Sequence, residues 1–454
     1  MTNKNQSSKS EYPSGSTAWA LVILLTISYI FSFYDRYILG LLIEPIKADL
    51  KLSDEQIGLV LGPAFAIFYA TMGLPVGWLV DRGRRSWIIS AGVSFWTLAT
   101  VACGLAKNFG QLFIARMAVG VGEATLNPSA MSMISDSFPP ERRGKPISVY
   151  VAALSLGAGL ASLIGGLILK WANSQDTIQF LGFTDISPWQ LAFFASAPPG
   201  ILLAIIFFFW KEPKRIAETG MEQETGGSFA EAFLYLKQNF GTYIGFISLS
   251  CVMSIIAYSQ GFLAPVFERS WGWSTEKYAF TNAVILLISG PAAVILSGII
   301  TDKLTQSGHQ DSTIKILMVS FLGVAITAVL MMFMPNGELA FSMIFLNTAS
   351  MAVMSAMGPA SVLVLAPSHI KGQLIAFYYI VTSLTGLFLG PMSAGILSTR
   401  VFGEENIRYA LASIPLIYGI IPLIFMPISY RKYCSLLSKQ SEATSTTSVV
   451  ANTN

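Results

Sequence analysis

The chain has 454 residues, of which 53% are hydrophobic and only 12% are charged. Soluble domains carry about 25% charged residues, so this composition excludes an ordinary soluble protein and indicates a polytopic membrane protein. The net charge of +3 is too small to indicate nucleic-acid binding, and the three cysteines lack the spacing of a metal site or a disulfide framework.

Twelve apolar segments follow one another along the chain, each long enough to cross a hydrocarbon layer of roughly 30 Å. They cover approximately residues 18–45, 55–80, 86–106, 110–136, 145–170, 188–210, 241–267, 276–301, 313–334, 339–365, 371–398 and 407–429. The first segment is too long for the apolar region of a signal peptide, so we expect it to remain as a helix. The sequence therefore predicts an all-α membrane protein with twelve transmembrane helices.

Lysine and arginine are distributed unevenly between the two sets of loops. The termini and the loops on the same side carry about 18 of these residues, against about 8 in the other loops. Because basic loops resist translocation, we expect a multi-pass protein of the cell membrane with both termini in the cytoplasm.

The longest polar interruption follows the sixth segment, and short motifs recur on either side of it. Ser53 to Glu55 is echoed by Ser274 to Glu276, and the pair Gly77 and Asp81 is echoed by Gly298 and Asp302. Such repeats predict two six-helix bundles with a substrate site between them. The predicted divisions are a cytoplasmic arm (1–17), an N-terminal bundle (18–210), a cytoplasmic linker (211–240), a C-terminal bundle (241–430) and a disordered cytoplasmic tail (431–454).

Four charged residues lie inside apolar segments: Asp35 and Arg36 in the first, Arg116 and Glu123 in the fourth. An uncompensated charge near a helix centre costs roughly 2.5 to 3.5 kcal/mol, so such residues usually face a protein interior or a water-filled cavity on a transport pathway. Arg116 and Glu123 are about two helical turns apart and point the same way. Arg36 and Glu123 could therefore face each other near the midplane. A static ion-pair cluster joining the two helices is the alternative.

These charges suggest how a proton and a cargo could be coupled. If an anionic headgroup captures Arg36 or Arg116, a carboxylate of Asp35 or Glu123 loses its partner and takes up a proton. We therefore predict substrate binding by the two arginines and proton coupling by the two carboxyls.

Aromatic and polar residues within the helices are predicted to complete an apolar cavity suited to an amphipathic anion. The predicted substrate contacts are Tyr34, Tyr37, Tyr69, Gln260 and Tyr378. The sequence has no phosphate-binding glycine loop followed by lysine, and no nucleophile, base and orienting group at a recognisable spacing. We therefore expect that transport is not powered by ATP hydrolysis and that the protein is not an enzyme. We also expect no catalytic residue, cofactor or metal site.

The loop from Gly77 to Arg85 resembles the loop signature of the major facilitator superfamily and lies between the second and third segments. Asp35-Arg36, combined with the run from Arg116 to Ala124, resembles the spinster family of that superfamily. The resemblance implies the superfamily's fold, a lysophospholipid or sphingolipid phosphate as cargo, and a gating role for Asp81 and Arg85, to which we add Gly77. Basic residues in that loop also serve topology.

The favoured interpretation is a monomeric secondary transporter that works by alternating access, with protons, an amphipathic anion and membrane lipids as partners. One alternative keeps the fold and changes the cargo to a small organic anion, because similar charged motifs occur in proton-linked anion transporters. The other alternative is a membrane receptor that binds without transporting.

Overall fold

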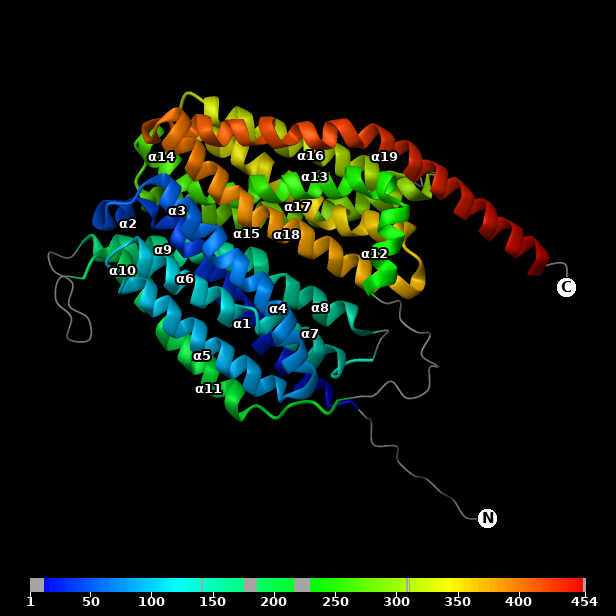
Figure 1. Ribbon diagram of the computed structural model, residues 1–454, viewed down its shortest axis with the longest axis horizontal. Helices are drawn as coiled ribbons and strands as arrows, with labels where there is room; N and C mark the ends of the chain where they lie inside the picture. The colour runs from blue at the N-terminus through cyan, green and yellow to red at the C-terminus, as the bar shows by residue number, and fades with distance from the viewer. Residues whose placement is uncertain are drawn as a thin grey trace, which may run out of the picture.

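The structure is a computed structural model that describes residues 12–139, 142–174, 186–215, 229–307, 309 and 311–451. Regular secondary structure in these ranges is helical. Figure 1 shows two groups of helices side by side, with α1 to α11 in one half and α13 to α19 in the other. The prediction of an all-α membrane protein with the fold of two helical bundles is confirmed.

The first half contains six membrane-crossing units, several of which are broken into two helices. Its helices are α1 (Gly15–Leu41), α2 (Ile43–Leu50), α3 (Asp54–Leu61), α4 (Pro63–Arg82), α5 (Arg85–Gly104), α6 (Phe109–Glu123), α7 (Leu126–Ser135), α8 (Gly144–Val151), α9 (Ala153–Ala172), α10 (Pro188–Phe194) and α11 (Ala197–Phe209).

The second half is built from longer helices, preceded by the short α12 (Phe229–Gln238) between the halves. Its helices are α13 (Phe240–Ser259), α14 (Leu263–Trp271), α15 (Thr275–Gln306), α16 (Ser312–Leu330), α17 (Gly337–Leu365), α18 (Lys371–Leu397) and α19 (Ile407–Ala451), with short helical turns after α13, α16 and α18.

Hydropathy predicted the helix boundaries closely: every predicted segment except the first begins within two residues of a helix start in the structure. Eleven helical segments of the described chain are long and apolar enough to span a membrane. The twelfth is formed by α6 and α7, which are separated at Ala124 and Thr125 and carry Arg116 and Glu123. The fourth segment is therefore a broken helix that carries two charges in its interior.

The C-terminal region differs from the expectation of disorder after residue 430. Helix α19 continues to Ala451, and its extension begins with residues that pack onto the second half. Tyr433 is completely buried there, and Leu436 and Leu437 contact the hydrophobic core. These apolar side chains pack the first two turns of the extension, before its Ser- and Thr-rich part, against the second half.

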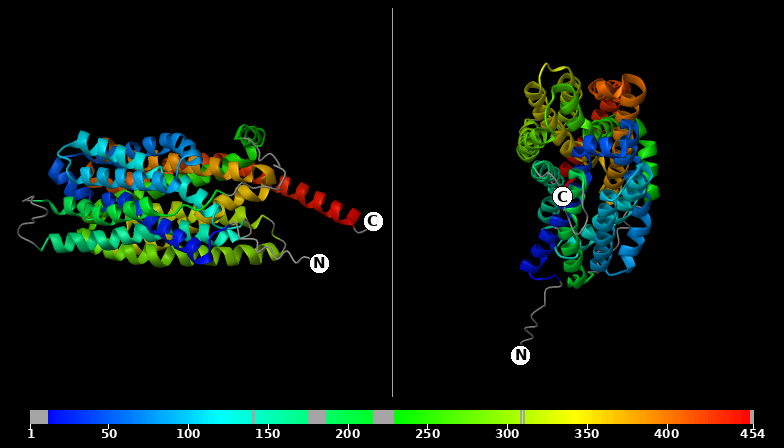
Figure 2. Two further views of the ribbon diagram at one scale, coloured as in Figure 1. Left: turned by 90° about the horizontal axis from the view of Figure 1, so that it is seen from below. Right: turned by 90° about the vertical axis from the view of Figure 1, so that its left-hand side faces the viewer.

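Both chain ends lie at one end of the molecule, which we call the termini end; α2, α14 and the start of α3 lie at the opposite, distal end (Figures 1 and 2). At the distal end α3 packs closely against α18 of the other half. A Cβ atom on Gly58 would come within 2.5 Å of the Pro391 carbonyl oxygen, so only glycine permits this approach.

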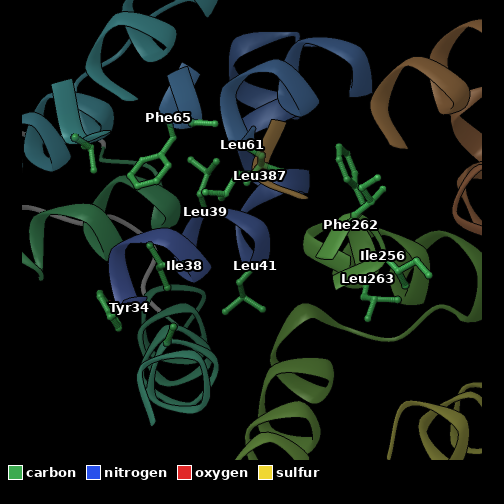
Figure 3. Packing of buried hydrophobic residues seen from close by; sticks show 14 of the residues in the cluster. Tyr34, Ile38, Leu39, Leu41, Leu61, Phe65, Ile256, Phe262, Leu263 and Leu387 are labelled. Atoms are coloured by element: carbon green, nitrogen blue, oxygen red, sulfur yellow. The ribbon is translucent and has the colours of Figure 1, made fainter. Parts of the chain in front are cut away.

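Buried apolar side chains from both halves meet next to this contact. Figure 3 shows Leu41 and Leu61 of the first half and Phe262, Leu263 and Leu387 of the second within one hydrophobic cluster. These residues place an apolar layer between the centre of the molecule and its distal end.

Candidate functional site

Arg36 of α1 and Glu123 of α6 form an ion pair in the interior of the first half. The Arg36 Nε donates a hydrogen bond of 2.6 Å to Glu123 Oε2, which also accepts one of 2.6 Å from the Ser32 hydroxyl. The Glu123 side chain is fully buried and that of Arg36 is 11% exposed. The expected approach of these two residues is therefore found in the structure.

Asp35 and Arg116 lie beside this pair and are also buried. The Thr100 hydroxyl donates to Asp35 Oδ2 at 3.3 Å, while Arg116 reaches only the Asp35 backbone carbonyl, at 3.4 Å. We call Asp35, Arg36, Arg116 and Glu123 the central cluster. Its formal charges sum to zero, which limits the cost of burying it.

Gly120 allows α6 to pack closely against α4. It faces the backbone of α4, where a Cβ atom would lie 2.7 Å from the Phe65 carbonyl oxygen. Because α6 can approach α4 this closely, Arg116 and Glu123 are brought to the same level as Phe65, next to Arg36. Gly120 therefore has a packing role in the site.

Three aromatic rings surround the Arg36 guanidinium. Its central carbon lies 5.0, 4.5 and 4.8 Å from the ring centroids of Phe33, Phe65 and Tyr69. Cation–π contacts of this kind are worth about 2 kcal/mol when desolvated. They hold the guanidinium in place without using its N–H groups, and the two terminal nitrogens make no hydrogen bond to any described residue.

A cavity of about 60 Å³ adjoins the central cluster between the two halves. Its lining residues are Phe33, Arg36, Tyr37, Gly40, Leu61, Phe65 and Arg116 of the first half and Ala257, Tyr258, Gly261, Leu387 and Pro391 of the second. Both arginines therefore face an apolar, aromatic space to which each half contributes.

Two of the five other predicted substrate residues lie at the cavity or against Arg36, and three lie elsewhere. Tyr37 lines the cavity and Tyr69 contacts Arg36, whereas Tyr34, Gln260 and Tyr378 are not among the described residues that line it. Tyr34 is stacked on Phe31 within the hydrophobic core, and Tyr378 is buried in the second half. Gln260 donates to Asn347 at 2.6 Å, which satisfies its amide inside the second half.

Several buried polar atoms of the central cluster are left without a partner. Within the described residues, no hydrogen bond reaches Asp35 Oδ1, Arg116 Nε or Glu123 Oε1. An unsatisfied buried polar group costs roughly 1 to 3 kcal/mol, more when it is charged. The cluster is therefore not the most stable way to join two helices, and it has unused capacity to bind a proton or a polar ligand.

Seven charged residues connect the two halves at the distal end. We call this group, Glu44, Lys47, Asp54, Glu55, Arg269, Arg400 and Glu404, the distal latch. Arg269 binds Glu44 at 2.5 Å and Asp54 at 2.7 Å, and Arg400 binds Glu55 at 2.6 Å. Lys47 contacts both Asp54 and Glu404.

Backbone and hydroxyl groups tighten the distal latch around Asp54, which is completely buried. The Ser398 hydroxyl donates to Asp54 Oδ2 at 2.6 Å, and the Asp54 backbone N–H donates to Glu404 at 2.7 Å. The latch and the apolar layer beneath it close the distal end in this conformation. In the sequence Asp54 and Glu55 stand out only as part of a repeat, because the partners that join them to the second half, Arg269 and Arg400, lie more than 200 residues away.

The predicted gating residues at the termini end contact only their own half and the linker that follows it within the described ranges. Arg85 is buried and binds Asp136 and Glu212, the latter at 2.6 Å. The backbone carbonyl of Asp81 accepts a hydrogen bond from Arg215. The space beside Gly77 is open, because a Cβ atom at this position would have no described neighbour within 4 Å. Among the described residues, the Asp81 carboxylate makes no contact with the second half.

A twelve-helix protein with two halves, a charged centre and a cavity between the halves belongs to the class of multi-pass membrane transporters. The family model described as Major Facilitator Superfamily matches residues 25–388, and the chain belongs to this superfamily. The superfamily and spinster resemblance inferred from the motifs is confirmed at this level.

The solved structures include a bacterial homolog of the human lysosomal transporter spinster in an inward-facing and unoccupied conformation. This chain is 25% identical to it, with a TM-score of 0.79, over 93% of this chain and 99% of that one. The similarity extends over nearly the whole of both chains.

Curated relatives are similar over a smaller share of their length. An MFS-type efflux pump of Mycolicibacterium smegmatis is 29% identical over 64% of this chain and 63% of its own. Protein spinster of Drosophila melanogaster is 23% identical over 64% and 47%, and a probable L-galactonate transporter of Escherichia coli is 25% identical over 63% and 62%. In each case the chain matches less than two thirds of the relative.

Proposed function

We propose that the protein is a secondary active transporter that moves an amphipathic, anionic, lipid-like molecule by alternating access, coupled to protons. The observation that carries this proposal is the Arg36–Glu123 ion pair at the wall of the central cavity. A cargo anion and a buried carboxylate compete there for one guanidinium.

Charge balance supports the coupling. The central cluster is neutral when both carboxyls are ionised, so a bound monoanion would leave one uncompensated negative charge in an apolar space. Uptake of one proton by Glu123 or Asp35 restores neutrality. The unpartnered Oε1 of Glu123 and Oδ1 of Asp35 are available to carry it. We assign proton coupling to these two carboxyls and anion binding to Arg36 and Arg116.

The cavity lining supports an amphipathic cargo. Phe33, Tyr37, Leu61 and Leu387 offer apolar and aromatic surface next to the arginines, as an alkyl chain with an anionic end requires. The spinster-like structural neighbour favours the same class of cargo.

Alternating access needs the two ends to close in turn. In this conformation the distal latch is formed, whereas Asp81 and Gly77 are free of the described part of the second half. We propose that Gly77, Asp81 and Arg85 act as the opposing gate, with Asp81 engaging the second half when the distal latch opens. We place the termini end in the cytoplasm from the excess of basic residues there, and we propose that the protein acts as a monomer.

A reconstituted flux assay tests the function. Proteoliposomes should take up a lysophospholipid saturably, and an imposed pH gradient should accelerate this uptake, with abolition by a protonophore. Small carboxylates at equal concentration should compete weakly. Saturable, pH-driven movement of small acids alone would contradict the lipid-like cargo.

A small organic anion is the second candidate cargo. The cavity volume of about 60 Å³ is small, and one relative bears the name of a sugar-acid transporter. A receptor without transport would bind the ligand in detergent but show no counterflow in the same liposomes.

A further inference from the structure

A second polar group lies beside the central cluster, toward the termini end. Asn127 of α7 donates to the hydroxyls of Tyr29 and Tyr69, each at 3.2 Å, and the Tyr150 hydroxyl donates to Asn127 Oδ1 at 2.7 Å. We call these four residues the Asn127 cluster. They come from α1, α4, α7 and α8, so four separate helices direct polar atoms to one point.

The hydrogen bonds of the Asn127 cluster leave protons unused. The amide and three hydroxyls carry five N–H and O–H protons, and three hydrogen bonds join them. Two protons therefore have no acceptor among the described residues, and this holds for either orientation of the amide. Tyr29 and Tyr69 are only partly buried, whereas Tyr150 is completely buried.

The Asn127 cluster is continuous with the Arg36 site. Tyr69 follows Phe65 by four residues on α4, and Asn127 follows Glu123 by four residues, a displacement of about 6 Å along a helix. The Tyr69 ring contacts the Arg36 guanidinium, whose terminal nitrogens are also without hydrogen bonds in the described chain. Unused donors from Arg36 and from the tyrosines therefore adjoin one another, beside a positive charge.

We propose that the Asn127 cluster is a headgroup subsite that binds the acceptor oxygens of the cargo anion beyond those held by Arg36. It determines specificity by the number of acceptor oxygens: a tetrahedral oxyanion, with three or more, engages both Arg36 and the tyrosines, whereas a carboxylate saturates Arg36 alone. The inference deepens the proposed function and rests on it, because the Asn127 cluster adjoins the cavity through the contact of Tyr69 with Arg36, which lines it. It assigns Tyr29, Tyr69 and Asn127 a role that charge patterns in the sequence do not suggest.

The test compares two probes that share one alkyl chain, dodecyl phosphate and dodecanoate, by equilibrium binding to the purified full-length protein and by flux. The double variant Tyr29→Phe/Tyr69→Phe removes both hydroxyls and keeps the rings that surround Arg36. We expect the Kd and KM for dodecyl phosphate to rise about tenfold, with less than about a twofold change for dodecanoate. The maximal rate and the pH dependence should stay unchanged, since Glu123 is untouched.

Tyr34→Phe and Tyr378→Phe are matched controls, because each removes a buried hydroxyl outside the cluster. Neither should change the preference between the two probes. An equal loss for both probes in the double variant, or no loss for either, would overturn the subsite. The binding measurement separates this result from failure of the proposed function, in which the unaltered protein binds dodecyl phosphate and moves neither probe.

Discussion

Glu123 combines three properties that the proposed coupling requires. It is fully buried, it shares its Oε2 with Arg36 and Ser32, and its Oε1 has no partner among the described residues. In the proposed coupling, Arg36 compensates the charge of this carboxylate until an anion draws the guanidinium away, and Glu123 then receives the coupled proton.

Glu123→Gln should therefore uncouple transport from protons. The amide keeps the size of the side chain and can still accept from Arg36, so we expect the variant to fold and to exchange cargo. Uptake driven by a pH gradient should fall to the level of the protonophore control, measured in proteoliposomes. Thr71→Ala, at an exposed hydroxyl on α4, should keep the gradient response. Gradient-driven uptake at the normal rate in Glu123→Gln would exclude Glu123 as the proton carrier.

We expect that replacing Arg85 lowers the stability of the folded protein more directly than it affects gating. Its guanidinium contacts Asp136 and Ser132 of the first half and Glu212 and the Pro213 carbonyl of the linker that follows, and its side chain is 1% exposed.

Arg85→Ala should destabilise the protein by about 3 kcal/mol, because two carboxylates lose a buried cation. The loss would appear as a lower midpoint in thermal unfolding in detergent. Arg84→Ala, beside it on the exposed side of the loop, should change the midpoint little. A stable Arg85→Ala variant with impaired transport would instead indicate a role in gating alone.

Residue spacing explains why some predicted contacts are absent from the cavity. Successive residues turn by about 100° in a helix, so Tyr34 points about 200° away from Arg36, whereas Phe33, Tyr29 and Gly40 share its face. A helical wheel centred on Arg36 would have selected Tyr29 in place of Tyr34. The contact of Gln260 with Asn347 could not be predicted in this way, because it depends on how two helices of the second half are rotated.

At the scale of helices, we compare two contacts between the halves, α3 with α18 and α15 with α9. These two seams differ in chemistry. The start of α3 binds the end of α18 through the distal latch, while the corresponding start of α15 meets the end of α9 through one hydrogen bond from Asn173 to Glu276, 2.7 Å long. Glu55 and Glu276 occupy matching places in the sequence repeat, yet only Glu55 has an ionic partner in the described chain. The seam between α3 and α18 therefore holds the distal end closed.

Arg269→Gln should shift the conformational equilibrium toward a state open at the distal end. Arg269 is the cation shared by Glu44 and Asp54, and its loss should favour opening by about 1 to 3 kcal/mol, at least about fivefold in population. Spin labels at Lys51→Cys and Glu405→Cys, both exposed distal positions, would report the change as a longer distance. Lys277→Gln breaks an exposed ion pair with Glu338 inside one half and should leave the distance unchanged.

The apolar pattern was enough to predict the helices, because a membrane span needs length and hydropathy and little else. The break between α6 and α7 and the distal latch were not predictable in the same way. The latch joins helix ends and loops that hydropathy treats as interruptions, and the pairs between the halves form only when α2 and α3 pack against α14 and the turn after α18. The sequence placed the charges of the central cluster on two helices and predicted that Arg36 and Glu123 face each other, but not that Arg116 contacts the Asp35 backbone carbonyl.

At the scale of the whole molecule, transport requires the distal end to open, which a covalent link can prevent. A short thiol-specific cross-linker between Glu55→Cys and Arg400→Cys should stop flux and preserve binding from the termini end. The cross-link needs a background in which Cys103, Cys251 and Cys434 are replaced. Linking Lys277→Cys to Glu338→Cys in the same background should leave flux intact. Continued flux with the first link in place would contradict alternating access through the distal end.

The make-up of the distal latch bears on how a charged cargo passes the distal end. The latch contains four carboxylates and three basic groups. Three of the four carboxylates and one of the three basic groups belong to the first half. Once the halves part, the newly formed portal carries a surplus of one negative charge. An anion meets this negative surplus whether it enters or leaves, so the same residues that close the distal end also raise an electrostatic barrier that is equal in both directions.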